Sequence, residues 1–453
     1  MPELLPTATA LSELRKTFPE AFRTSETLRR AGFQALFAGG CVRDALLGRS
    51  AKDIDLATDA TPDQVEALFP RTHAFGKAFG VIQVQEGEAL FEVATFRRDF
   101  EYEDGRRPGR IEPSNPQHDA ERRDFTINGL FLDPHSGELI DFIGGREDLA
   151  AGCVRAIGDP ALRFREDHLR MLRAVRFAAT LGFEIHPDTR AAIRAHAADL
   201  PRIAAERIRE EFVRLLTESP RPGDAVAQLH DCGLLQHILP EFLLLRGCGQ
   251  PPEWHPEGDV WTHTLLMLNE LRHPSPALAL AVLLHDIGKP ATRSVDADGR
   301  IRFTGHAQVG AAIAARWMTR LKFSRALRDQ VCGYVDRHMN FINVPQMRPA
   351  TLRRLAASPT LDEELELHRL DCRCSNGITE SYDRIQEFRA ALAETPELPE
   401  PWIRGQDLLA LGLTPGPELG RWKQRAFDAQ LESRFPSREA LLDWIRDALH
   451  AQG

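Results

Sequence analysis

The chain has 453 residues and a formal net charge of −9, a length that suits roughly two to four domains. No apolar run approaches the roughly 18 residues of a membrane-spanning helix, and Glu3 and Glu13 do not fit the acid-free start of a transit peptide, so we expect a cytoplasmic protein without a membrane partner. Seven cysteines, an odd number without a Cys-x-x-Cys pair, indicate neither a disulfide framework nor a zinc knuckle.

Residues 1–26 predict a helical arm that Pro19 interrupts. Residues 36–38 then form a short apolar strand that ends at Gly39 and Gly40. Two glycines allow the backbone to turn with positive φ and to approach a ligand closely. Amides freed in such a turn can point at phosphate oxygens.

A short helix is expected over residues 41–48, with Arg43 available as a counter-charge for phosphate. In residues 53–57, the period of a strand places Asp53 and Asp55 on one face. Two such carboxylates repel each other unless a cation lies between them, and Mg²⁺ prefers oxygen ligands and substrate phosphates. A pair of aspartates alone is more often a solvated edge strand, but the glycine turn and Arg43 favour a phosphoryl-transfer site with two ions.

A strand over residues 91–96 leads into a segment rich in glycine, proline and charge that ends at Arg122. We predict that this segment, which includes residues 104–108, is a mobile loop over the site. Glu92 on the strand is a candidate third carboxylate for the metal ions, with a half-buried structural role as the alternative. The segment also carries a basic cluster of Arg97, Arg98, Arg106, Arg107 and Arg110.

Residues 39–44 (GGCVRD), followed by residues 53–55 (DID), resemble motif A of the family of class II tRNA nucleotidyltransferases and bacterial poly(A) polymerases. Three later segments resemble further motifs of that family in the same order: residues 122–130 (RRDFTINGL), 166–177 (EDHLRMLRAVRF) and 206–212 (ERIREEF). The resemblance implies that Asp53 and Asp55 are the catalytic carboxylates that hold Mg²⁺. It also implies a nucleotide-binding set of Gly39, Gly40, Arg43, Arg122, Arg123, Asp124, Asn128, Asp167, Arg170, Arg173 and Arg176.

The spacing of two residues within the segment 166–177 also indicates a role, independently of the family. Asp167 and Arg170 are three residues apart, hence neighbours on one helix face, and together they offer acceptors and donors to the edge of a base. On spacing alone, an ordinary salt bridge on a solvated helix would be the better interpretation. In the family, the matching pair selects CTP and ATP without a nucleic-acid template, and Arg173 and Arg176 would face phosphates.

The acidic net charge does not exclude RNA, because phosphate binding follows local charge. Residues 162–216 hold eleven arginines against eight acidic residues, a local balance of +3.

A second group of metal-ligating residue types lies in a helical region in the middle of the chain. Adjacent residues such as His285 and Asp286 cannot share a helix face, but at a helix end both can converge on a cation. Residues 283–289 (LLHDIGK) resemble the central motif of the HD phosphohydrolase domain. This resemblance implies His263 and Asp371 as the further metal ligands.

Imidazole with carboxylate suits a transition metal such as Ni²⁺, Mn²⁺ or Co²⁺, which lowers the pKa of bound water. His306 and His338 are expected to line this site without binding the metal. Two roles stay open for the domain: hydrolysis of phosphomonoesters or 2′,3′-cyclic phosphates, or service as an RNA-binding body.

The expected fold is α+β, with a polymerase-β-like α/β head followed by an all-helical neck, an HD-containing body and a tail. The predicted boundaries are 1–26 for the arm, 27–150 for the head, 151–215 for the neck, 216–375 for the body and 376–453 for the tail. In the tail, residues 405–408 and 412–418 resemble a turn motif of the family that would contact tRNA, with a plain capped turn as the alternative.

The resemblance implies addition of CCA to the 3′ end of tRNA from CTP and ATP, with release of pyrophosphate. Enzymes that add only A or only CC fit nearly every motif, and a poly(A) polymerase shares the head. From another class, the chain could be chiefly an HD phosphohydrolase. The oligomeric state stays open.

Overall fold

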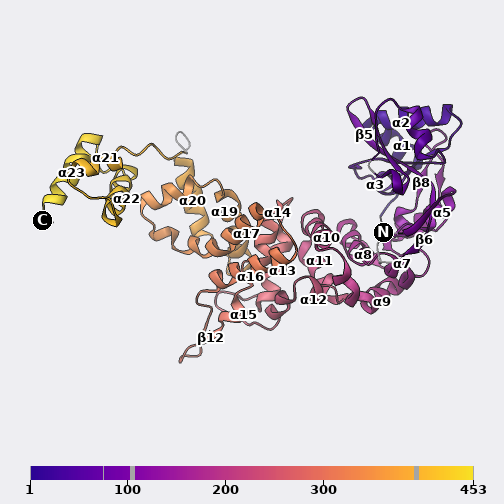
Figure 1. The fold of residues 1–453 in the computed structure, drawn as a ribbon. Coiled ribbons are helices and arrows are strands. Elements are labelled where there is room, and N and C mark those ends of the chain that lie inside the picture. The colour runs from indigo at the N-terminus through magenta and orange to yellow at the C-terminus, as the bar shows by residue number, and fades with distance from the viewer. Residues whose placement is uncertain (1, 75, 103–107, 392–396, 452–453) are drawn as a thin grey trace. The chain divides into compact units, whose positions relative to one another are not determined.

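The computed structural model describes the chain except residues 1, 75, 103–107, 392–396 and 452–453 (Figure 1). It divides into two compact units. The first comprises Met1–Leu244, Leu268–Ala279 and Arg316–Ser324, and the second comprises Leu245–Met267, Leu280–Ala315 and Arg325–Gly453. Among the described residues, no helix combines the length and the apolar character that crossing a membrane requires.

A mixed sheet of seven strands, in the order β3-β4-β5-β2-β1-β8-β9, forms the head. Only β2 and β5 are parallel, and the other neighbouring strands are antiparallel. The strands are β1 Ala35–Ala38, β2 Asp55–Thr58, β3 Thr72–His73, β4 Val81–Glu86, β5 Ala89–Thr95, β8 Phe131–Leu132 and β9 Leu139–Ile140.

Strand β1 lies in the core of the head. All four residues of β1 are buried, as expected for a short apolar run covered on both faces. Phe22 of helix α2 packs edge-on against Phe37 of β1, with ring centroids 4.8 Å apart. The other helices here are α1 Thr7–Thr17, α2 Pro19–Arg30, α3 Gly40–Leu46, α4 Pro62–Leu68, α5 Pro116–Glu121 and α6 Gly145–Ala151.

Three local predictions can be compared with these elements. The break at Pro19 is confirmed, because α1 ends at Thr17 and Pro19 is the first residue of α2. The placement of Asp53 inside a strand was wrong, since β2 begins at Asp55. The loop between Phe96 and Arg122 was also wrong, since β6 Arg97–Tyr102 and β7 Pro108–Pro113 form an antiparallel hairpin. Most of the predicted stretch 104–108 lies outside the described residues.

After the head, the chain is helical apart from two-residue strands. The neck contains α7 Pro160–Glu166, α8 Leu169–Leu181, α9 Pro187–His196 and α10 Ala205–Glu218, and α8 packs along α10. Short strands β10 Cys153–Val154 and β11 Glu184–Ile185 pair in parallel beside them. Helices α11 Pro222–Asp231 and α12 Leu235–Ile238 follow. The predicted switch to helix after residue 159 is confirmed.

The middle of the chain carries the second group of candidate metal ligands. Its elements are α13 Val260–Glu270, α14 Pro276–Leu284, α15 Lys289–Thr292, β12 Ser294–Val295, β13 Ile301–Arg302, α16 His306–Arg320, α17 Arg325–Arg337, α18 Pro349–Ala356, α19 Leu361–Cys374 and α20 Glu380–Ala391. Short 3₁₀ helices lie at Lys77–Phe79, Thr126–Asn128, Ala197–Arg202, Pro240–Leu245 and His338–Gln346.

The tail has a small core of its own. Its helices are α21 Gly405–Ala410, α22 Pro417–Leu431 and α23 Arg438–His450. Leu408, Trp422, Leu441 and Ile445 are buried together between them. The α+β class is confirmed, while the five-part division stays a prediction because the two compact units do not test it.

Candidate functional site

A cavity of about 570 Å³ joins the head to the neck in the first unit. The predicted catalytic and nucleotide-binding residues all lie in its wall, whereas Glu92, the candidate third carboxylate, is not among the lining residues. The lining residues are Gly39, Gly40, Arg43, Asp44, Arg49, Ser50, Lys52, Asp53, Asp55, Arg122, Arg123, Asp124, Asn128, Asp167, Arg170, Arg173, Arg176, Phe177, Thr180, Leu181, Arg214 and Glu218.

The glycine turn connects β1 to α3 at one edge of this cavity. Gly39 has a φ of 76°, and a Cβ there would lie 2.9 Å from Arg123 Nη1, so both the conformation and the space require glycine. Its N–H donates to the carbonyl of Leu130 at 3.1 Å, so the amide of Gly39 itself is not available to a phosphate. The first-turn amides of α3, beginning at Gly40, have no acceptor within their helix. These amides remain the donors suited to phosphate.

Arg43 is held inside the wall by two side chains. Its guanidinium donates to Asn128 Oδ1 at 2.6 Å and to Asp44 Oδ1 at 2.8 Å. Only 8% of Arg43 is exposed. It can therefore supply positive charge to the cavity with a fixed orientation.

The carboxylates of Asp53 and Asp55 lie where β2 begins. Asp55 is in register with Glu92 of the parallel strand β5, which places these two side chains on the same face of the sheet. Removal of its carboxyl from water among the neighbouring groups, reinforced by repulsion from Asp53 and Glu92, raises the pKa of Asp55 to about 6, although the residue keeps an exposed surface in the cavity. A divalent cation would relieve this repulsion, and the all-oxygen donor set fits Mg²⁺. Whether Glu92 is a third ligand stays a prediction.

Two buried carboxylates orient the arginines of the second motif. Asp119 of α5 pairs with Arg122 at 2.6 Å and with Arg123 at 2.9 Å. Asp124 pairs with Arg173 of α8 at 2.7 Å and accepts from Asn128 Nδ2 at 3.0 Å. Burial alone would raise the pKa of Asp124, but Arg173 and Asn128 outweigh it and lower this pKa to about 2.

The expectation that Asp167 and Arg170 share one helix face was wrong. α7 ends at Glu166 and α8 begins at Leu169, so Asp167 has extended backbone in the break between them. Its carboxylate accepts from Arg207 of α10 at 3.0 Å, while Arg170 donates to Glu166 at 2.8 Å. Both side chains nevertheless line the cavity.

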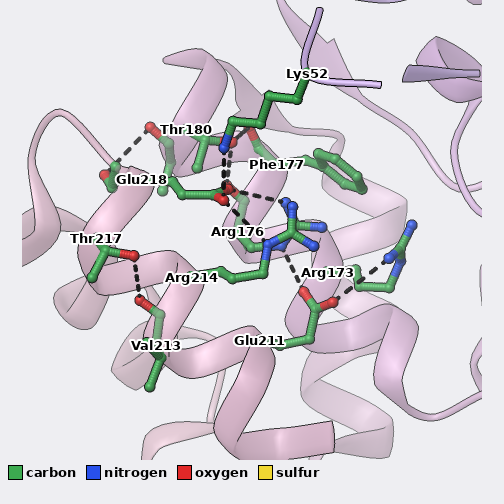
Figure 2. A network of polar contacts seen from close by, with 12 residues as sticks. Lys52, Arg173, Arg176, Phe177, Thr180, Glu211, Val213, Arg214, Thr217 and Glu218 are labelled. Carbon is green, nitrogen blue, oxygen red and sulfur yellow. Dashed lines mark hydrogen bonds and ion pairs between the residues drawn. The ribbon is translucent and has the colours of Figure 1, made fainter. Parts of the chain in front are cut away.

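Arg173 and Arg176 continue the row along α8 and also line the cavity (Figure 2). Arg176 is only 3% exposed and donates to Glu211 of α10 at 2.6 Å. Glu211 also lies 3.6 Å from Arg173. One carboxylate from α10 thus holds both arginines in place.

The charged residues that line one end of the cavity were not assigned by the sequence analysis. Lys52 pairs with Glu218 at 2.9 Å, and Arg214 pairs with the same carboxylate at 3.3 Å (Figure 2). Arg49 donates to the main-chain carbonyls of Thr180 and Leu181 at 3.0 and 3.1 Å. Lys52 and Glu218 are 166 residues apart in the chain, so no local pattern could predict their contact. The sequence offered one signal for a role of Lys52 in this site, which was its position next to Asp53.

The second candidate site is centred on Asp286 in the second unit. α14 ends at Leu284, so His285 and Asp286 stand at a helix end, as expected. Asp286 Oδ2 lies 3.2 Å from His285 Nε2 and 2.6 Å from Lys289 Nζ. Asp286 Oδ1 lies 3.5 Å from His306 Nε2 and 3.8 Å from His338 Nε2.

His263 completes the group from α13. Its Nε2 lies 3.2 Å from Asp371 Oδ1, and its Nδ1 lies 2.7 Å from Glu257 Oε1. Metal-ligating atoms of His263 approach those of His285 and Asp286 within 4.8 Å. The structure therefore brings the four predicted ligands together. Glu257, which sequence reasoning missed, fixes the ring of His263 from its other nitrogen.

His306 and His338 face each other with their Nε2 atoms, and both of these atoms are hydrogen-bond acceptors in the neutral rings. The Nδ1 atoms of His306 and His338 contact the carbonyls of Phe303 and Val335 at 2.8 and 2.6 Å, so these nitrogens must donate. In the neutral rings the Nε2 atoms are then acceptors, yet they face each other at 3.1 Å.

Burial lowers the pKa of His306 and, reinforced by repulsion from His285, lowers that of His338 to about 4. Both rings are therefore neutral near pH 7. Converging neutral imidazoles beside a carboxylate fit a metal ion, and they add His306 and His338 to the candidate ligands with Asp286. A cavity of about 700 Å³ opens at this group.

Comparison of the sequence with known proteins finds relatives from one family. The CCA-adding enzyme of Latilactobacillus sakei is 34% identical over 418 residues, which cover 91% of this chain and 93% of that protein. The chain belongs to the CCA-adding enzyme family. The CCA-adding enzyme of a Geobacillus species is 42% identical over 226 residues, or 50% of this chain and 55% of that protein. The chain thus spans about half the length of several curated relatives that it matches.

Structure and sequence profiles agree with CCA-adding family membership. The solved CCA-adding enzyme of Bacillus stearothermophilus in complex with CTP aligns with a TM-score of 0.72 at 26% identity, over 96% of this chain and 98% of that chain. Family profiles match a poly A polymerase head domain at residues 35–155, a probable RNA and SrmB-binding site of polymerase A at 182–245, and an HD domain at 259–373. The predicted family and the predicted HD domain are confirmed.

Proposed function

We propose that the chain adds the 3′-terminal CCA of tRNA from CTP and ATP, with divalent cations at Asp53 and Asp55. The observation that carries this proposal is the single cavity in which the carboxylate pair, the glycine turn and the base-reading candidates Asp167 and Arg170 meet. A template-independent polymerase needs these three elements around one nucleotide.

In the proposed reaction, the 3′-oxygen of the tRNA forms a bond to the α-phosphorus of the incoming nucleotide. The bond from that phosphorus to the bridging oxygen breaks, pyrophosphate leaves, and the hydroxyl proton passes to water. Bound Mg²⁺ would polarise the attacking oxygen and neutralise the triphosphate. Arg43, Arg123 and Arg173 contribute fixed positive charge, because Asn128, Asp119 and Asp124 already orient their guanidinia.

Asp167 and Arg170 present complementary groups to the base. Arg207 fixes the carboxylate of Asp167, and Glu166 fixes the guanidinium of Arg170. Because each partner is held by a protein group, the pair can reject a base whose edge offers the wrong donors and acceptors.

The deciding experiment supplies the protein and Mg²⁺ with a tRNA that lacks its 3′ end, with CTP alone, ATP alone or both, and reads product length on a sequencing gel. Two added residues with CTP alone and three with both nucleotides support the proposal. Arrest after CC, addition only to a CC-ended tRNA, or an unlimited A ladder would each replace it with one of the alternatives.

A second activity is favoured by the convergence of acceptors around Asp286. We propose a metal-dependent phosphohydrolase for phosphomonoesters or 2′,3′-cyclic phosphates, with Ni²⁺, Mn²⁺ or Co²⁺ held by His263, His285, Asp286 and Asp371, and with His306 and His338 as further candidate ligands beside Asp286. Lys289, whose ammonium lies 2.6 Å from Asp286, adds positive charge beside the phosphate position. Phosphate release from 2′-AMP and opening of a 2′,3′-cyclic nucleotide to its monoester, each measured with each metal, test this activity, and the absence of both reactions with every metal would refute it.

A further inference from the structure

One end of the nucleotide cavity is a cluster of charges that the motifs leave out. We call the side chains of Lys52, Arg214 and Glu218 the Glu218 cluster (Figure 2). Lys52 belongs to the segment between α3 and β2, and Arg214 and Glu218 lie in the last turns of α10. All three line the cavity.

The cluster holds more positive than negative charge. Lys52 and Arg214 share the carboxylate of Glu218, and Arg176 Nη1 lies 3.9 Å from it. Elsewhere in the cavity, Arg173 pairs with Asp124, and Arg122 and Arg123 pair with Asp119. The Glu218 cluster therefore has a surplus of cationic groups over carboxylates.

Its cations are also accessible. The side chains of Lys52 and Arg214 are 74% and 48% exposed, against 3% for Arg176. Ion pairs at this exposure are weak because water competes for both partners. An entering anion can therefore take the place of Glu218 at little cost.

The position of the Glu218 cluster at the end of α8 indicates which anion would reach Lys52 and Arg214. Arg170, Arg173, Arg176 and Thr180 follow one another along α8, and all of them line the cavity. Ten residues separate Arg170 from Thr180, about 15 Å along a helix. A nucleotide whose base lies at Arg170 would run past Arg173 and Arg176 and end near Thr180 with its last phosphate.

We propose that Lys52 and Arg214 bind the terminal phosphate of the incoming nucleotide, with Glu218 as the resident counter-ion that this phosphate displaces. The same two cations hold the leaving pyrophosphate, and return of Glu218 to them favours its release. The inference rests on the proposed nucleotidyl transfer and adds residues outside the family motifs to its substrate site.

The test measures equilibrium binding of CTP and CMP, without tRNA, to the full chain and to Lys52→Gln, Arg214→Gln and Glu218→Gln. We expect the first two variants to bind CTP about three- to tenfold more weakly, in the range of a typical hydrogen bond, with CMP binding unchanged. Glu218→Gln should bind CTP more tightly and be inhibited by pyrophosphate at lower concentration.

The sign of the Glu218→Gln effect separates this role from a structural tie. If the ion pair only joined the head to the neck, Lys52→Gln and Glu218→Gln would weaken CTP binding in the same direction. That result, or an equal loss of CMP binding, would overturn the inference. A raised KM for tRNA with unchanged CTP binding would also overturn it, because the phosphate would then come from tRNA.

The chain offers a matched control. Lys322 pairs at 2.8 Å with Glu206, at the other end of α10, with 62% and 42% of the side chains exposed. Lys322→Gln and Glu206→Gln should leave CTP binding and pyrophosphate inhibition unchanged. Incorporation by the unaltered chain is measured in parallel, and its absence would refute the proposed function and this inference together.

Discussion

Asp55 is a carboxylic acid of the transfer cavity whose pKa is raised by its neighbours. Its carboxyl is in register with Glu92 and two positions from Asp53. Removal of the carboxyl from water and these two like charges together raise its pKa to about 6. A carboxyl group that resists ionisation beside two like charges is one whose ionised form a divalent cation stabilises strongly, because the ion replaces repulsion by attraction.

The first prediction concerns the metal carboxylates themselves. Asp53→Ala should lower the rate of CMP incorporation at least about a thousandfold, comparable to the loss of a group that stabilises transition-state charge. Asp59 is a matched control, since it is exposed, follows the same strand and accepts from the Gln34 N–H at 2.7 Å. Asp59→Ala should incorporate CMP at the normal rate. Normal turnover by Asp53→Ala would contradict the assignment.

The second prediction is a pH dependence of metal binding. A raised carboxyl pKa means that Asp55 takes up a proton as the pH falls through about 6, and a proton competes with the ion. The Mg²⁺ concentration for half-maximal incorporation should be flat above about pH 7. Below pH 6 it should rise about tenfold per pH unit for one competing proton. A constant Mg²⁺ requirement from pH 5 to 8 would show that Asp55 does not bind the ion.

At the scale of elements, the break between α7 and α8 positions Asp167, the proposed base-reading carboxylate. α7 ends at Glu166, and Asp167 accepts from the Leu169 N–H at 3.1 Å as α8 begins. Arg207 then reaches this carboxylate from α10. An uninterrupted helix would leave Asp167 on a helical surface, so the base-reading pair depends on how two helices meet a third.

The third prediction tests this arrangement. Asp167→Ala should reduce the preference for C and A over U and G by about tenfold or more, since a specific hydrogen-bonding group is lost, while the Mg²⁺ requirement stays unchanged. Arg207→Gln should give a smaller loss in the same direction, because Asp167 remains but loses its partner. Asp188→Ala, at an exposed position of α9, serves as the control. Unchanged selectivity in Asp167→Ala would refute the template role.

At the scale of the whole molecule, an acidic chain contains two separate groups of candidate metal ligands. The transfer cavity offers nine cationic side chains against six carboxylates, although the chain carries a net charge of −9. The candidate metal ligands in this cavity, Asp53 and Asp55, are carboxylates, whereas the candidate group around Asp286 is rich in imidazole. The two centres belong to different compact units.

The fourth prediction is a crossed pattern of loss. His285→Ala should abolish metal-dependent phosphate release and leave CCA addition within about twofold, while Asp53→Ala should do the reverse. His285 is fully buried, so the thermal stability of the variant is measured alongside, and Asp371→Asn provides a second, more conservative loss of a ligand. Loss of both activities in Asp371→Asn with unchanged stability would show that the centres are not independent.

The sequence by itself determined the chemistry of both centres. Short-range patterns sufficed for the glycine turn, for Asp55 at the start of β2, and for His285 with Asp286 at a helix end, because these features depend on neighbours in the chain, but they placed Asp53 wrongly inside the strand. These local patterns also supported the resemblance that the comparisons confirmed. They could not place the hairpin β6–β7, where cross-strand pairing overrides a composition rich in glycine, proline and charge.

Only the tertiary structure decided which groups act on these residues. Asp167 turns to Arg207 rather than lying on a helix face with Arg170, and Lys52 meets Glu218 across 166 residues of chain. His306 and His338 oppose their Nε2 atoms at 3.1 Å because backbone carbonyls fix their other nitrogens. Such contacts arise from the packing of segments distant in sequence, and a local pattern carries no information about which distant charge a side chain will meet.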